Sequence, residues 1–150
     1  MRDAMGGTVT ITIVVVFIVF ALSYMAFNVN YTKAFRMKDK IISLYDDYDG
    51  KCEMECQEKI RKYADKVGYS GGAATGASAV CPKDGGYHAD GTNTYCYVEK
   101  DLGEGADGKE RKYYKVATRI TIDFPLFRNV LNYNVFYVFG DTKTYKYDPN

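Results

Sequence analysis

Four cysteines are the residues whose type and spacing most directly predict chemistry. Cys52, Cys56, Cys81 and Cys96 all follow a long apolar segment near the N-terminus. An even number of cysteines in a small domain behind a membrane segment is typical of two disulfides formed in an oxidising compartment. A zinc site is the alternative, but zinc ligands favour cysteine pairs separated by two residues, and these pairs are separated by three and by fourteen. We therefore expect disulfides and no metal.

The expected pairing of the cysteines depends on a helix predicted over Glu53–Lys66. Cys52 and Cys56 would lie about one helical turn apart, where Cβ atoms are about 5–6 Å from each other. A disulfide brings its two Cβ atoms to about 3.8 Å. We therefore expect each of these cysteines to pair with Cys81 or Cys96, so that the disulfides tie the helix to the later part of the chain.

The other polar residues predict no catalytic or metal site. The single histidine, His88, lies in the stretch DGGYHADGTN and is expected to face solvent. The run Asp47–Gly50 resembles the middle of a calcium-binding EF-hand loop, but Tyr45 and Cys56 would then stand at its first and last ligand positions. Hydrolase, metalloprotease and phosphate-loop motifs are lacking. We expect no enzyme and no cofactor, and a net charge of +1 argues against nucleic-acid binding.

A long uncharged segment near the N-terminus precedes the part of the chain that contains the cysteines. There is no charged side chain between Asp3 and Lys33, and the most apolar part, Val9–Phe27, matches the roughly 20 residues that cross a bilayer as a helix. It is apolar on every side, so it predicts a membrane span over residues 8–28 and not an amphipathic soluble helix. A buried helix of a soluble protein is the alternative. The side chains expected to pack this stem against lipid or sister stems are Val14, Val15, Val16, Phe17, Ile18, Phe20, Ala21 and Tyr24.

The helix is expected to continue beyond the membrane span as an amphipathic half. Ala34, Met37, Ile41, Leu44 or Tyr45, and Tyr48 repeat at spacings of three and four, and Gly50 is a natural end. A helix over residues 8–49 would be about 60 Å long. A signal peptidase could cut near Ala21, Ser23 or Ala26, but we favour a retained anchor because the apolar run is longer than a signal sequence needs.

The remaining chain predicts an α+β domain over residues 50–150. After the second helix, which Gly68 ends, a Gly/Ala-rich stretch over residues 70–93 is expected to be a surface loop. Period-two alternation then predicts an antiparallel sheet of three or four strands with one wet face, lying on the amphipathic half of the long helix. The strands are expected at Thr94–Lys100, Tyr113–Phe124, Asn132–Phe139 and Thr142–Tyr147, with a turn at Gly103–Gly108 and a short connection at Leu126–Leu131.

Two signals disagree on which side of the membrane the domain lies. Lys33, Arg36, Lys38 and Lys40 follow the stem, and the positive-inside rule would place them in the cytoplasm. The cysteines favour an oxidising compartment outside the cytoplasm. We expect a single-pass protein with an extracytoplasmic domain, because disulfides are common in small secreted domains.

This layout resembles the type IV pilin superfamily, and more narrowly the pseudopilins and minor pilins of tight-adherence (Tad) systems. The resemblance covers nearly the whole chain. It rests on a short polar leader, residues 1–7, that ends in Gly6-Gly7, on the uncharged run Thr8–Asn28, on the extended helix through Tyr48 and on the tyrosine-rich C-terminal sheet. It implies cleavage by a prepilin peptidase after Gly6 or Gly7 and packing of the stems into a filament.

The resemblance implies a structural subunit of a pilus-like filament or secretion apparatus. Its partners would be the lipid bilayer and other pilin-like stems. Pilins usually carry a glutamate at the fifth mature position, where this chain has Ile11 or Thr12 depending on the cut. A minor, tip or platform subunit that stays in the membrane is compatible with that difference. The alternative is a single-span extracellular binding or adhesion module that does not polymerise.

Overall fold

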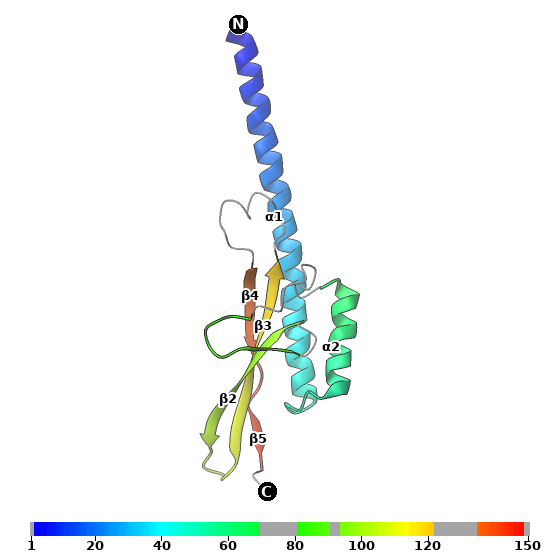
Figure 1. Ribbon diagram of the computed structural model, residues 1–150, viewed down its shortest axis with the longest axis vertical. Coiled ribbons are helices and arrows are strands. Elements are labelled where there is room, and N and C mark those ends of the chain that lie inside the picture. The colour runs from blue at the N-terminus through cyan, green and yellow to red at the C-terminus, as the bar shows by residue number, and fades with distance from the viewer. Residues whose placement is uncertain (1, 70–80, 91–93, 122–134, 149–150) are drawn as a thin grey trace.

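A computed structural model describes residues 2–69, 81–90, 94–121 and 135–148 of the 150-residue chain. The elements are α1 (Arg2–Asp47), α2 (Met54–Val67), β1 (His88–Ala89), β2 (Cys96–Glu104), β3 (Glu110–Thr121), β4 (Val135–Asp141) and β5 (Tyr145–Tyr147). The first half of α1 projects alone beyond the rest of the molecule, and the second half lies between α2 and the sheet (Figure 1). The predicted α+β class, with a long apolar helix, a short helix and an antiparallel sheet, is confirmed.

α1 is 46 residues long, which corresponds to about 70 Å. It begins at Arg2 and not at Thr8, because Gly6 and Gly7 weaken a helix by only about 1 kcal/mol each relative to alanine and need not leave helical geometry. It ends two residues before the expected Asp49. Asp49 and Gly50 then adopt positive φ angles of 48° and 79°, which turn the chain towards α2.

The second half of α1 carries the core of the domain. Its buried side chains are those of the predicted stripe, so the amphipathic half is confirmed: Ala34, Met37, Ile41, Leu44 and Tyr45. α2 packs beside it through Cys56, Ile60 and Ala64. As predicted, Gly68 ends α2, in left-handed geometry, with its N–H donating to the carbonyl of Asp65 at 3.2 Å.

The sheet is antiparallel in the order β1-β2-β3-β4, with β5 pairing with β3. It has five strands because His88, expected in a loop, forms a two-residue strand that pairs with Tyr97; its side chain is exposed as expected. The expected strands agree with β2, β3, β4 and β5 to within a few residues where they are described, a normal uncertainty for strand ends. The expected connection at Leu126–Leu131, the ends of two strands (122–124 and 132–134) and most of the 70–93 loop (70–80 and 91–93) lie outside the described residues.

The inner face of the sheet lies directly on α1. Val116, Thr118 and Ile120 of β3 point towards the helix, and the buried Thr118 hydroxyl donates to the carbonyl of Ala34 at 2.9 Å. β4 approaches α1 so closely that a Cβ at Gly140 would lie 2.7 Å from side-chain atoms of Lys38 and Ile42. Helix and sheet are therefore packed as one body.

The outer face of the sheet is less exposed to solvent than the alternation of residues in β3 predicted. Ala117 is 1% exposed although it points away from α1. Its register partner on one side, Cys96, is bonded to Cys81, and its partner on the other side, Phe139, contacts Tyr87 with ring centroids 5.8 Å apart. The segment 81–90 thus covers this part of the sheet, which a period-two pattern within β3 cannot reveal.

Candidate functional site: an exposed apolar stem on a cross-linked domain

The first half of α1 is apolar, and the described part of the chain covers little of it. Most of its large side chains are between 50 and 70% exposed: Val9, Ile11, Ile13, Val14, Val15, Val16, Phe17, Ile18, Phe20, Leu22, Tyr24 and Met25. The helix is long and apolar enough to cross a membrane: its most apolar 18-residue window has a mean hydropathy of 2.5, and only 6% of that window is buried within the described chain. The described part of the chain therefore does not bury this helix as a soluble core. An apolar surface of this size needs lipid or other helices around it.

Three hydroxyl groups along α1, two of them within the stem, are paired with the backbone of the helix itself. The hydroxyls of Thr12, Ser23 and Thr32 donate to the carbonyl oxygens of the residues four positions earlier, at 2.9, 2.6 and 2.8 Å. Such bonds leave the hydroxyl hydrogen paired without water. The stem can therefore lie in hydrocarbon despite its threonines and serine.

The predicted stem residues are brought onto one exposed helix but not onto one face. Of the eight side chains expected to pack, Ala21 is half-buried and the others are exposed. An added Cβ at Gly7 would meet no described atom within 4 Å. Packing within the described chain therefore gives no reason for glycine there.

An aromatic row marks the point where the stem meets the domain. The rings of Phe27, Tyr31 and Phe35 follow one another along α1, with centroids 6.2 Å apart at each step. Phe136 of β4 meets Phe27 edge-on at 6.3 Å. Tryptophan and tyrosine are enriched where a membrane protein passes from hydrocarbon to water, and Tyr31 is the member of this row that fits that rule.

The four basic residues that follow the stem are divided between different environments. Lys38 has little exposed side chain, forms an ion pair with Asp39 at 2.8 Å and lies over the ring of Phe35. Lys33 donates to the carbonyl of Gly68 at 3.3 Å. Arg36 and Lys33, together with Lys66 of α2, line one groove, which Lys40 does not. Two of the four basic residues, Lys38 and Lys33, therefore make contacts within the fold.

All four cysteines form disulfides, as predicted, but the predicted pairing is wrong. The bonds are Cys52–Cys56 and Cys81–Cys96. The helical geometry that argued against the first bond is absent, because Glu53 is the extended N-cap of α2 and Cys52 lies before it. The Cα atoms of Cys52 and Cys56 are 5.1 Å apart, within the usual range for a disulfide.

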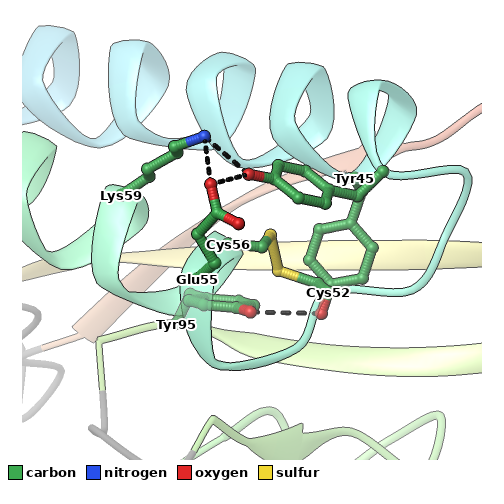
Figure 2. Close-up of a disulfide and its surroundings, with 7 residues drawn as sticks. Tyr45, Cys52, Glu55, Cys56, Lys59 and Tyr95 are labelled. Atoms are coloured by element: carbon green, nitrogen blue, oxygen red, sulfur yellow. Dashed lines mark hydrogen bonds and ion pairs between the residues drawn. A yellow bond between two sulfur atoms is a disulfide. The ribbon is translucent and has the colours of Figure 1, made fainter.

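The turn from α1 to α2 is cross-linked by more than its disulfide (Figure 2). The hydroxyl of Tyr48 donates to Glu55 at 2.8 Å, and the ammonium of Lys59 lies 2.6 Å from that hydroxyl and 2.8 Å from the Glu55 carboxylate. The hydrogen bonds from Lys59 and then Tyr48 lower the pKa of Glu55. The Cys52–Cys56 bond lies beside this cluster, so α2 is fastened to the end of α1.

A buried tyrosine pair links α1 to the start of β2. The hydroxyls of Tyr45 and Tyr95 are 3.1 Å apart, and both residues are buried. Burial raises the pKa of Tyr45 to about 12, so its hydroxyl stays neutral and keeps the hydrogen bond throughout the physiological range. Burial also raises the pKa of Tyr95. The pair adds a rigid contact and no reactive group at neutral pH.

Asp49, from the stretch that resembles an EF-hand loop, and Asp107, in the turn between β2 and β3, are both engaged with protein cations. Asp49 accepts a hydrogen bond from Lys143 at 3.2 Å. Asp107 pairs with Lys146 at 2.8 Å and with Arg111 at 3.1 Å, and these hydrogen bonds lower its pKa. Within the described ranges, no group of three or more potential ligands is arranged to hold a metal ion.

Comparisons with models of protein families, with curated proteins and with solved structures find no match for this chain. Its function must therefore be argued from the stem, from the domain fastened to it and from their junction.

Proposed function

We propose that this protein is a structural subunit of a pilin-like assembly, anchored in a membrane and assembled through its stem. One observation carries the proposal: an apolar helical segment that the described part of the chain leaves largely exposed continues without a break into the core helix of a cross-linked domain. Catalysis does not require such a helix. A subunit of an assembly requires an apolar stem that neighbouring subunits can contact and a rigid connection from that stem to the domain outside the membrane.

The domain is proposed to lie outside the cytoplasm. Two disulfides in so small a domain support an oxidising compartment. The basic residues after the stem oppose this orientation under the positive-inside rule. We give them less weight, because Lys38 is paired with Asp39 and packed on Phe35, and therefore has a role within the fold.

Close packing of stems is proposed to use the small residues of α1. Association of helices within a bilayer relies on van der Waals contact, and small side chains allow two backbones to approach. Gly7 and Ala26 are exposed, and an added side chain at Gly7 would meet open space. Processing after Gly6 would keep Gly7 as the first residue of the stem, whereas processing after Gly7 would remove it and leave Ala26 for this role.

Self-association in a bilayer tests this proposal. We expect energy transfer between donor-labelled and acceptor-labelled copies of the full chain in vesicles, falling when unlabelled protein is added. Gly7→Leu and Ala26→Leu are expected to reduce the transfer several-fold, because each adds bulk where stems approach. Leu22→Ile, which keeps apolar volume at a neighbouring exposed position, is the control.

Insertion is measured in the same vesicles by resistance to alkaline extraction. Inserted protein whose energy transfer never exceeds that of randomly distributed monomers would contradict assembly through the stem. It would favour the other candidate, a single-span binding module that acts alone. The isoleucine or threonine at the fifth mature position, in place of the glutamate usual in pilins, is the observation that keeps that candidate open.

A further inference from the structure

A groove lies between α1 and α2 where the stem enters the domain. It has a volume of about 490 Å³ and is lined from α1 by Asn28, Val29, Thr32, Lys33 and Arg36. α2 contributes Lys66 and Val67, from its last turn. The two valines supply apolar surface among three cationic side chains.

The charge in this groove is all of one sign. None of the described residues that line it carries a carboxylate. Among the described residues, the ion pairs of the two helices use Lys38, Lys59 and Lys62, and none uses Lys33, Arg36 or Lys66. The hydrogen bond from Lys33 to the Gly68 carbonyl joins one cation to the end of α2 but does not neutralise it. Three like charges around one groove favour an anionic ligand.

The position of the groove along α1 indicates which anion it meets. The apolar run ends at Phe27, and the groove begins at the next residue, Asn28. At 1.5 Å per residue, Lys33 and Arg36 lie about 9 and 14 Å beyond Phe27 along the axis. The side chains of α1 lean towards its N-terminus, which is the direction of the membrane, and long basic side chains extend to reach headgroups. The headgroup layer is about 5–8 Å thick on each side of the hydrocarbon.

We propose that this groove binds the phosphate headgroup of an anionic phospholipid in the leaflet next to the domain. Lys33, Arg36 and Lys66 contact the phosphate, and Val29 and Val67 contact the apolar part of the lipid beside it. This proposal rests on the membrane anchoring in the proposed function but not on self-association. It also accounts for a basic flank on the side of the membrane where the disulfides place the domain.

The test is lipid binding by the monomeric full chain in neutral detergent, measured by native mass spectrometry. The probes are phosphatidylglycerol and phosphatidylcholine with identical acyl chains. We expect the unaltered chain to prefer phosphatidylglycerol. A basic residue near an anionic membrane surface contributes about 1 kcal/mol, so Lys33→Gln, Arg36→Gln and Lys66→Gln should each reduce that preference about fivefold, and the triple variant should lose it. Lys51→Gln makes the same change of charge at the opposite end of the helices and should have no effect.

Several outcomes would overturn the proposal. A triple variant that keeps both its disulfides and its preference for phosphatidylglycerol would show that the groove is not the lipid site. Equally tight binding of soluble glycerol phosphate would identify a free phosphate ligand and not a lipid. A triple variant that keeps the lipid preference but loses energy transfer in phosphatidylcholine vesicles would assign the groove to a neighbouring subunit. Failure of self-association alone leaves the lipid result unchanged, so the two proposals can fail separately.

Discussion

Replacing Val16 by lysine is expected to abolish stable membrane anchoring of the full chain. Val16 is 62% exposed near the middle of the apolar run, so its replacement would place a charge deep in the hydrocarbon. A lysine at the centre of a membrane helix costs about 2.5–3.5 kcal/mol on insertion scales, or roughly a hundredfold in partitioning. Alkaline extraction of membranes should release most of the variant, and assembly through the stem should be lost with it. Ile18→Lys is expected to behave in the same way.

The matched control for this change is Ser43→Lys, on the second half of the same helix. Ser43 is exposed on the part of α1 that belongs to the domain, so a lysine there remains in water. Circular dichroism should show equal helix content for both variants in detergent. Full retention of the Val16→Lys protein in extracted membranes would mean that the stem is not what anchors the chain.

Removing the Cys81–Cys96 disulfide is expected to destabilise the domain more than removing the Cys52–Cys56 disulfide. The first bond closes a separation of 15 residues and the second a separation of 4. The chain-entropy model assigns them about 3 and about 2 kcal/mol respectively. The first bond also fastens the segment that covers Ala117, so its removal should expose apolar surface of the sheet.

Urea unfolding of the two double Cys→Ser variants, in the full chain in detergent, measures the difference. The Cys52/Cys56 variant serves as the comparison, because Tyr48, Glu55 and Lys59 still hold the same turn. Equal unfolding midpoints for the two variants, or a lower midpoint for the Cys52/Cys56 variant, would contradict the role assigned to the cover over the sheet.

The stem and both helices could be predicted because their signals are local. An uncharged run long enough to cross a bilayer needs no knowledge of the rest of the chain, and Gly68 ends α2 through its own backbone geometry. The amphipathic stripe from Ala34 to Tyr45 could also be read directly, because helical periodicity places those residues on one face.

The disulfide pairing could not be predicted, because it depends on the state of a single residue. Had Cys52 been the first helical residue, its distance to Cys56 would have disfavoured a bond; Glu53 in an extended conformation reverses that conclusion. The burial of Ala117 likewise follows from the bond between Cys81 and Cys96. This bond holds the segment 81–90 against the sheet, and no local sequence pattern predicts that contact.

The basic groove could not be predicted either, because its residues come from two helices whose contact the sequence does not show. The sequence shows four basic residues after the stem, yet one of them, Lys38, is engaged with Asp39 and Phe35. The third cation of the groove, Lys66, comes from the end of another helix. Only the packing of α2 beside α1 brings Lys33, Arg36 and Lys66 together. A count of basic residues after the stem therefore includes Lys38, which does not line the groove, and misses Lys66, which does.

The central claim is that the first half of α1 lies in the hydrocarbon of a bilayer while its second half lies in water with the domain. The chain contains no tryptophan, so a single introduced tryptophan reports on one position alone. Phe17→Trp places it in the stem and Ser43→Trp places it in the domain, about 39 Å further along the helix. Quenching by lipids brominated along their acyl chains, at low protein-to-lipid ratio, compares the two. Strong quenching at position 17 and none at position 43 is the predicted result. Accessibility of position 17 to aqueous iodide, with no quenching by brominated lipid, would contradict it.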